Sequence, residues 1–330
     1  MGDAQDRDAG PSDLSARMRG ARLVRARHRD RQHAEAHAAA HAHVTVPDLP
    51  NVPRGEPVLW QDEPGLKGLV GELRAVGRFA YDSEFIGELT YVPRLCLVQV
   101  ATPRRVALVD PLAGLDLRPF WELVADPGIE KIVHAGAQDI EPVFRSLGRP
   151  AANVFDTQIS AGFVRMAYPV ALSKLVHELL GVKLGKGLTF THWDQRPLSP
   201  MQLRYAADDV RYLVACRDEL GRRLEAMGRR GWAQEESNAL CDPSQYEFDA
   251  DCDYLRVRGA AALKPQGLAI LRELTQWREA AGRHPDVPAR ALLCAGGMVE
   301  LSRSPPRPVG KLRRVRGLPR PVEQQHGQEI

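Results

Sequence analysis

The sequence predicts an α/β domain, in which helices flank a mixed β-sheet, followed by an all-α helical domain. Two patterns along the chain lead to this prediction. Apolar runs typical of strands alternate with amphipathic helical segments up to about residue 150, and from residue 151 onward the pattern is mostly helical. A length of 330 residues suits about two domains, and a hydrophobic content of 44% suffices for a buried core.

Residues 1–55 are predicted to form a disordered, low-complexity arm that ends in a proline-rich linker. A basic run at 15–27 is interpreted as a solvated tail, with a helix that contacts nucleic acid as the alternative. His33, His37 and His41 repeat every four residues, and His43 follows them. This spacing would let one helical face hold a transition metal, but alanine-rich low complexity is the preferred interpretation.

The spacing of apolar residues predicts each element of the α/β domain in turn. Helices are expected over 66–73, 119–125 and 140–147, and strands over 78–85, 95–101, 105–110 and 130–134. Pro93 and Pro103 separate the strands, and Gly148 with Pro150 ends the last of these helices.

The rest of the chain is predicted to be helical. Apolar residues at helical period indicate a helix over 172–181, which a glycine ends. Ser199 followed by Pro200 is a standard helix start, and this helix is expected to run to about Met227. Residues 228–257 are interpreted as a connection of mixed character, and a strongly periodic helix is expected over 265–281.

Charge is distributed unevenly, although the formal net charge is only +3. Residues 56–255 carry a net charge of −7, and residues 256–330 carry +8. An acidic middle followed by a basic tail fits a metal site beside a polyanion-binding module, although chance differences between domains explain it as well.

Composition also bears on the compartment. The five cysteines form no C-x-x-C pair, which argues against a zinc knuckle and indicates free thiols in a reducing cytoplasm. No stretch approaches the ~18 apolar residues of a membrane span, and the N-terminal residues lack the apolar segment of a secretory signal. We therefore expect a cytoplasmic protein that does not bind a membrane.

Asp82 and Glu84 lie two residues apart in a predicted strand, so both carboxylates should point to one face of the sheet. Their neighbours are mostly apolar, and two anions in such surroundings repel each other and are costly to desolvate. A divalent cation would remove both costs. The alternative is that the two acids simply form the polar end of a strand.

Three further residues are candidates for the same chemistry. Asp139 stands between a predicted strand and a helix, where an ordinary helix-start acid is the alternative. Tyr205 and Asp209 are four residues apart on a predicted helix and therefore share a face. The alternative is a core tyrosine beside a solvated aspartate.

In this order, the acidic pair, the later aspartate and the Tyr–Asp pair resemble the tyrosine-containing branch of the DEDD exonuclease superfamily. The motifs FAYDSEF (79–85), YVPRLCLVQ (91–99), VDPL (109–112), KIVHAGAQD (131–139), FDTQ (155–158) and WDQRPLS (193–199) resemble the ribonuclease D family. The segments at 263–279 and 312–319 resemble the helicase-and-RNase-D C-terminal (HRDC) domain of that family. The resemblance covers residues 56–330.

The resemblance implies an RNase H-like 3′–5′ exonuclease domain over 56–220, a connecting segment over 221–257 and an HRDC domain over 258–330. It implies an exoribonuclease with two divalent metal ions, Mg²⁺ or Mn²⁺, bound by Asp82, Glu84, Asp139 and Asp209. Tyr205 would orient the attacking water or accept its proton. The product would be a nucleoside 5′-monophosphate. The expected substrate is RNA with a free 3′ end, transfer-RNA precursors above all, and no obligate protein partner is inferred.

Other residues are weaker candidates, each with a simpler alternative. His134, Lys186, Trp193 and Arg196 are expected to contact substrate, and Lys174 flanks the same face. The alternative for the histidine is a ring hydrogen-bonded to the backbone, and the alternative for each lysine and the arginine is a solvated surface charge. The alternative for the tryptophan is packing in the core. Asp156 is expected to hold the residues of the site in place without binding metal or substrate itself.

The sequence departs from the family pattern in its C-terminal part. It has room for one HRDC domain where bacterial ribonuclease D usually has two, and the helix near Val322 is expected to be cut short at Ile330. The glycine-rich start at 295–298 is expected to weaken this domain. Three other functions stay open: a DNA-directed 3′–5′ exonuclease, a catalytically silent nucleic-acid-binding protein, and an adaptor that uses the basic C-terminal helices.

Overall fold

A computed structural model describes residues 46–87, 90–185, 192–283, 286–306 and 309–330. The histidine-rich and basic runs before residue 46, and also Lys186, lie outside the described residues. The chain divides into two compact units. The sheet unit comprises Ala38–Ile86 with Leu95–Glu247, and the helical unit includes Gly87–Arg94 and Phe248–Ile330.

The sheet unit is built on a mixed sheet, as the sequence predicts. In the described part of the chain six strands lie in the order β1-β4-β3-β2-β5-β6. Their bounds are β1 Val58–Trp60, β2 Arg78–Ile86, β3 Arg94–Ala101, β4 Val106–Val109, β5 Glu130–Val133 and β6 Val154–Asp156. Strands β3 and β4 pair antiparallel, whereas β1 with β4, β2 with β5 and β5 with β6 pair parallel. The sequence did not indicate β1 and β6, because three residues are too few to show a period.

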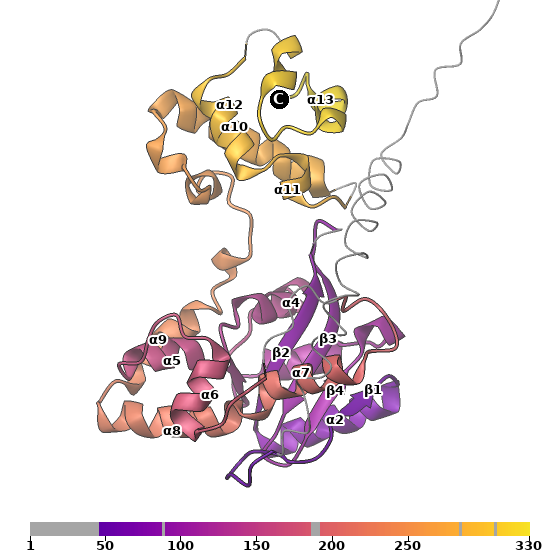
Figure 1. Cartoon of the computed structure of the whole chain (residues 1–330), viewed down its shortest axis with the longest axis vertical. Coiled ribbons are helices and arrows are strands. Elements are labelled where there is room, and N and C mark those ends of the chain that lie inside the picture. Colours follow the sequence, from indigo (N-terminus) through magenta and orange to yellow (C-terminus); the bar gives the residue numbers. More distant parts are fainter. Residues whose placement is uncertain (1–45, 88–89, 186–191, 284–285, 307–308) are drawn as a thin grey trace, which may run out of the picture. The chain divides into compact units, whose positions relative to one another are not determined.

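Helices cover both faces of the sheet (Figure 1). On one face α2 (Glu63–Val76), α3 (Arg118–Val124) and α4 (Ala137–Leu147) pack on a core that includes Phe79, Tyr81 and Phe120. On the other face α7 (Pro200–Arg211) packs against a core that includes Ala80 and Leu97. Because side chains alternate along a strand, Asp82 and Glu84 of β2 share the α7 face with Ala80.

A further helical layer completes the sheet unit. Its members are α5 (Thr157–Phe163), α6 (Leu172–Leu180), α8 (Leu213–Ala226) and α9 (Arg230–Ala239), which enclose their own apolar core. The prediction of one helix from Ser199 to Met227 is wrong, because the backbone breaks at Tyr212 between α7 and α8. The buried ring of Tyr212 belongs to this third core, whereas α7 and the first residues of α8, Leu213 and Val214, belong to the core beside the sheet.

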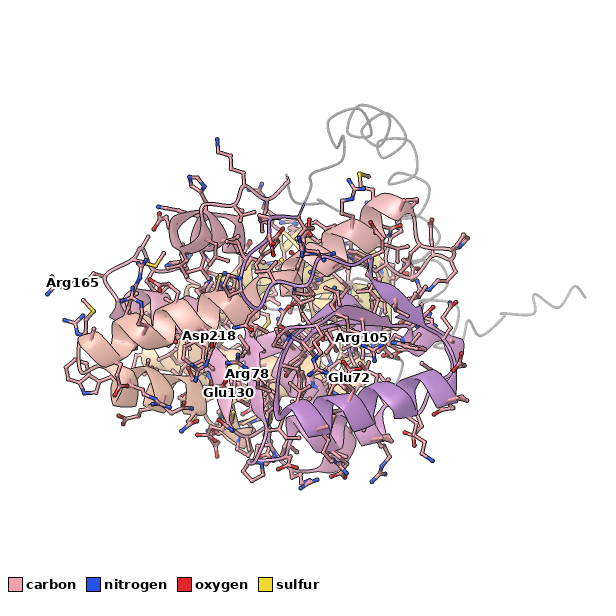
Figure 2. All side chains as sticks on the ribbon, turned by 90° about the horizontal axis from the view of Figure 1, so that it is seen from below. Glu72, Arg78, Arg105, Glu130, Arg165 and Asp218 are labelled. Atoms are coloured by element: carbon pink, nitrogen blue, oxygen red, sulfur yellow. The ribbon has the colours of Figure 1, made fainter. Side chains whose placement is uncertain are left out.

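Ion pairs fasten α8 to the sheet at the start of β2 and β5. Arg78 binds both carboxylate oxygens of Asp218, at 2.7 and 3.2 Å (Figure 2). Arg217 binds Glu130 at 2.7 Å. The Asn51 side chain also donates to Asp218, at 2.8 Å. On α7 the buried Arg211 donates to the carbonyls of Pro53 and Gly55. Residues 51–55 are thereby held against the helical layer.

The helical unit contains α10 (Pro265–Arg283), α11 (Ala289–Leu292), α12 (Ala295–Arg303) and α13 (Arg320–His326). Five short 3-10 segments occur in the described residues of the two units, at Pro111–Ala113, Pro243–Gln245, Asp253–Arg256, Ala260–Ala262 and Val309–Arg314. Among the described residues, no helix has both the length and the apolar character that crossing a bilayer requires.

The glycines of the helical unit allow close packing. A Cβ atom on Gly267 of α10 would lie 2.9 Å from the carbonyl oxygen of Ser302 on α12. In the glycine-rich start of α12, Gly297 is buried, and a Cβ atom there would lie 2.8 Å from Leu293. The glycine-rich start of α12 was expected to weaken the domain. Gly297 also has a packing role, because its lack of a side chain lets α12 approach its neighbours closely.

Candidate active site

Three carboxylates converge where β2 passes under α7. Asp82 and Glu84 of β2 and Asp209 of α7 each offer an oxygen, and these oxygens all lie within 4.8 Å of one another. The two-residue period of β2 points the first two toward α7, and the helix places Asp209 opposite them. All three side chains are half-buried, so the cluster is open enough to admit a ligand.

Asp139 joins this cluster from the first turn of α4, and its side chain is only 6% exposed. Its carboxyl group lies close enough to Asp82 and Glu84 for their negative charges to act on it. The Tyr81 hydroxyl donates to the Asp139 carbonyl oxygen at 3.4 Å and helps to fix this turn. The four acids named from the sequence are thus brought together.

Burial and mutual repulsion shift all four acids in the same direction. Burial raises the pKa of Asp82 to about 6. Burial, and next the charge of Asp82, raise the pKa of Glu84 to about 8. For Asp209, burial is the largest cause and the negative charges of Asp82 and Glu84 come next, and together they raise its pKa to about 9. The same causes raise the pKa of Asp139 well above its usual value. Four such groups cannot all be ionised near neutral pH without a compensating cation.

This donor set fits a hard divalent metal ion. Carboxylate oxygens are the ligands that Mg²⁺ and Mn²⁺ prefer, and a bound cation would offset both the desolvation and the repulsion. The described residues contribute no thiolate or imidazole to the cluster, which argues against a site built for zinc.

Tyr205 stands one turn before Asp209 on α7, close enough for that carboxyl group to act on the phenol. Burial, and next the negative charges of Asp209, Glu84 and Asp82, raise the pKa of Tyr205 well above its usual value of 10. The phenol therefore keeps its proton in the metal-free site. It can hold a water molecule by hydrogen bonding, but it is a poor acceptor of a proton.

Trp193 is buried, at 5% exposure, and its ring centroid lies 6.3 Å from that of Tyr205. A ring enclosed in this way has no free face on which a base could stack. The expectation that Trp193 contacts substrate is therefore replaced by its alternative, packing in the core, here directly against Tyr205.

Arg196 uses all five of its N–H donors inside the protein. Nε and Nη2 bind the two carboxylate oxygens of Asp110 at 2.7 and 2.5 Å. Nη2 also donates to the Cys96 carbonyl at 2.7 Å, and Nη1 donates to those of Trp193 and Gln195 at 2.7 and 2.8 Å. No donor is left for a phosphate, so the expectation of a substrate contact by Arg196 fails on geometry.

His134 and Asp156 lie behind the site. Both ring nitrogens of His134 have protein partners, the Thr157 hydroxyl at 2.9 Å and the Val170 carbonyl at 3.0 Å. Burial lowers the pKa of His134, although Asp156 opposes this shift. A proton on Nε2 satisfies the contact with the Val170 carbonyl, whereas the Thr157 hydroxyl has one proton to share between Nδ1 and the Val133 carbonyl at 2.9 Å. Both ring nitrogens have protein partners, which corresponds to the simpler alternative of a histidine held by its surroundings. Lys174 is exposed and pairs with Glu178 at 3.6 Å.

Asp156 holds the turn from which Asp139 is presented. Its carboxylate accepts hydrogen bonds from the N–H groups of Ala135 and Gly136, at 3.2 and 2.9 Å, and also caps the start of α5. Ala135 has a φ of 57°, a left-handed conformation that costs about 1–2 kcal/mol outside glycine. The buried carboxylate stabilises this conformation, and we propose that it thereby positions Asp139.

Replacing Asp156 by Ala is expected to lower the free energy of unfolding by about 2–3 kcal/mol, since several buried N–H groups lose their acceptor. It should also lower kcat about 10-fold, because the turn before Asp139 loosens. Chemical denaturation and steady-state kinetics measure the two effects. Asp62→Ala is the matched control, since Asp62 caps α2 by accepting from Gly65 at 2.7 Å and is exposed. An equal loss of activity in both variants would contradict the positioning role.

The sequence reasoning did not identify Asp110 as a site residue. The signal was present as an aspartate that ends a strand before a proline, at 109–112. Its partner Arg196 follows 86 residues later, a separation that local patterns cannot bridge.

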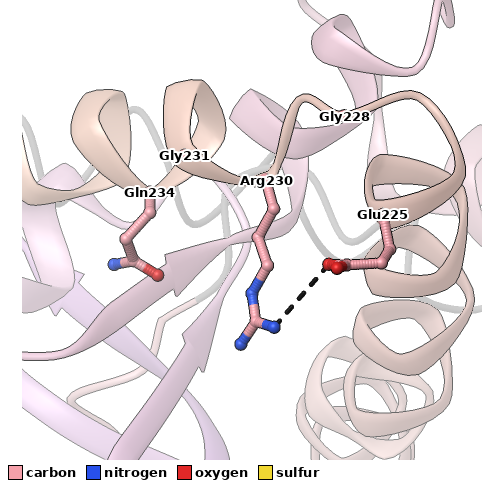
Figure 3. A pocket seen from close by; sticks show the side chains of 5 residues that line it. All are labelled: Glu225, Gly228, Arg230, Gly231 and Gln234. Carbon is pink, nitrogen blue, oxygen red and sulfur yellow. Dashed lines mark ion pairs between the residues drawn. The ribbon is translucent and has the colours of Figure 1, made fainter.

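An open pocket of about 430 Å³ lies away from these acids, at the turn between α8 and α9 (Figure 3). It is lined by Glu225, Gly228, Arg230, Gly231 and Gln234, with Arg230 and Glu225 paired at 3.7 Å. The pocket has none of the converging carboxylates, so we do not assign the reaction to it.

Comparison with known proteins identifies the family of this chain. Residues 57–225 match the family model described as 3′-5′ exonuclease, and residues 267–330 match the HRDC domain. Fold and site together define a 3′–5′ exonuclease. A ribonuclease D from Zymomonas mobilis is 38% identical over 262 residues, which cover 79% of this chain and 67% of the relative.

Two further relatives agree. A ribonuclease D from Gluconacetobacter diazotrophicus is 36% identical over 80% of this chain and 67% of its own length. The crystal structure of Escherichia coli RNase D, described as an exoribonuclease involved in structured RNA processing, superposes with a TM-score of 0.72. It is 30% identical, and the match covers 83% of this chain and 73% of that one. The chain belongs to the ribonuclease D family of 3′–5′ exoribonucleases.

Proposed function

We propose that this protein removes single nucleotides from the 3′ end of RNA, using two divalent metal ions, Mg²⁺ or Mn²⁺, held by Asp82, Glu84, Asp139 and Asp209. The observation that carries the proposal is the convergence of these acids, three of them within 4.8 Å of one another. A cluster of acids whose pKa values are all raised is costly unless it binds a cation.

Bound divalent ions would supply a nucleophilic hydroxide near neutral pH and would stabilise the charge on the attacking and leaving oxygens. Side chains of the protein position the attacking water and the end of the RNA. Tyr205 holds the attacking water by a hydrogen bond, and its position one turn before Asp209 on α7 places its hydroxyl group beside the carboxylates. Glu84 accepts a hydrogen bond from the terminal 3′-hydroxyl group, which confines cutting to chain ends. The product is a nucleoside 5′-monophosphate.

The proposed substrate is RNA with a free 3′ end, and transfer-RNA precursors are the proposed class. Support comes from family membership and from a basic surface on the helical unit. Lys311, Arg313, Arg314 and Arg316 are all exposed and follow one another within six residues. Such a concentration of positive charge suits the phosphate backbone of a polyanion. We further propose that the protein works in the cytoplasm without an obligate protein partner.

The proposal is tested with a 5′-labelled single-stranded RNA and a DNA of the same sequence, each with Mg²⁺, with Mn²⁺ and with EDTA. We expect a ladder that shortens from the 3′ end of RNA, that EDTA abolishes and that a 3′-terminal phosphate suppresses. Equal or faster loss of DNA would instead indicate a DNA-directed exonuclease. Binding of RNA without any degradation would indicate a catalytically silent protein and would overturn the proposal.

A further inference from the structure

We propose that Arg196, held by Asp110, is a positioning residue for Tyr205 and acts through the ring of Trp193. The inference rests on the proposed function and adds to it the residues that keep the tyrosine in place. It also gives a physical reason why an arginine lies close to the site without touching the substrate.

The first step is the anchoring of the arginine to the sheet. Asp110 directly follows β4, is 1% exposed and donates its backbone N–H to the Trp60 carbonyl of β1 at 3.0 Å. Gln61 donates to the same carboxylate at 2.9 Å. Arg196 binds both oxygens of this carboxylate and also the Cys96 carbonyl of β3. The guanidinium is thus fixed to strands β3 and β4.

The second step joins the arginine to the loop before α7. Its remaining donors, on Nη1, bind the carbonyls of Trp193 and Gln195 and hold the loop in a tight fold around the guanidinium. Only a planar group with five donors can satisfy a carboxylate and three carbonyls together. A lysine has three donors on one point charge and cannot replace it.

The third step joins the loop to the tyrosine. The Trp193 ring packs beside the Tyr205 ring, with 6.3 Å between centroids and 36° between planes. Gln202 on α7 donates to the His192 carbonyl at 3.4 Å and shares a capping box with Ser199. The loop at 192–199 therefore contacts α7 at its start and at Tyr205. A displacement of this loop would move the phenol relative to the carboxylates.

We expect Arg196→Lys to lower kcat by about 10- to 100-fold on RNA, because small misplacements of a reacting group are costly. KM should change less than about threefold, since Arg196 has no donor left for the substrate. The decisive comparison is with Tyr205→Phe. If Arg196 acts through the tyrosine, the double variant should be no slower than the slower single variant.

The matched control is Arg217→Lys. Arg217 is as exposed as Arg196, at 21% against 22%, and its pair with Glu130 lies on α8 and β5. This variant should lose stability with an unchanged kcat. Circular dichroism checks folding, and if Arg196→Lys does not fold, Asp110→Asn takes its place, because that change leaves the three carbonyl contacts of Arg196 available.

Three results would overturn the inference. Losses that multiply in the double variant would show that Arg196 acts independently of Tyr205. A raised KM with an unchanged kcat would indicate a substrate contact, and an unchanged kcat and KM would show no role in activity. The wild-type protein is measured first, so that failure of the proposed function itself, with no degradation of RNA, is distinguished from these results.

Discussion

Replacing Asp209 by Asn is expected to lower kcat for nucleotide release from RNA by about three orders of magnitude, or about 4 kcal/mol of transition-state stabilisation. The substitution removes one of the converging carboxylates and with it a negative charge that a divalent ion requires. It also removes a negative charge beside the Tyr205 hydroxyl group. We therefore expect weaker metal binding and a less well positioned attacking water.

The neighbouring Asp208 offers a matched control on the same helix. Its carboxylate pairs with Arg211 at 3.3 Å and is not one of the converging ligands. Asp208→Asn should therefore keep kcat within a few-fold of the wild type. Single-turnover kinetics with saturating Mg²⁺ or Mn²⁺ measure both variants. Similar losses of kcat in the two variants would show that negative charge on α7 in general, and not the carboxylate cluster, supports activity.

The same Asp209→Asn change is expected to stabilise the metal-free protein, raising the free energy of unfolding at pH 8 by about 1–3 kcal/mol. The cause is the removal of one acid from a crowded, partly desolvated cluster. Asp208→Asn should change the free energy of unfolding less, because the pair with Arg211 offsets part of the burial cost that raises the pKa of Asp208. Urea unfolding in EDTA measures the sign of each change.

The pH dependence of this effect follows from the raised pKa values. In the unfolded chain these carboxyl groups lose their protons near pH 4, whereas in the folded protein Glu84 does so at about 8 and Asp209 at about 9. Between these limits the folded state holds more protons, so stability of the metal-free wild type falls as pH rises from about 4 to 9. Saturating Mg²⁺ should reverse the fall, and the gain in melting temperature should be larger at pH 8 than at pH 6. A gain independent of pH would contradict binding at these acids.

The period of each element predicted which of the acids share a face, whereas the resemblance to a known family predicted that they meet in one cluster. Asp82 and Glu84 lie on one face because side chains alternate along β2, and Tyr205 and Asp209 lie together because four residues make about one helical turn. These relations are local, so a single sequence displays them. The mixed sheet was predictable for the same reason, since its longer strands and helices each have a visible period.

The remaining features depend on contacts between distant segments. The pairing of Asp110 with Arg196 joins a strand end to a loop, and nothing near either residue indicates the other. Arg196 was therefore interpreted as a phosphate contact, although the protein itself uses all of its donors. The break at Tyr212 was equally hidden, because helical residues continue on both sides of it and Tyr212 itself keeps nearly helical backbone angles.

The most direct test uses an RNA that carries a labelled phosphate between its last two nucleotides. We expect the wild-type protein to release the label as a nucleoside 5′-monophosphate in the first turnover, with Mg²⁺ or Mn²⁺ present. EDTA or Asp209→Asn should prevent the release. Label that leaves within an oligonucleotide, or release that EDTA does not affect, would contradict a metal-dependent 3′–5′ exoribonuclease at this carboxylate cluster.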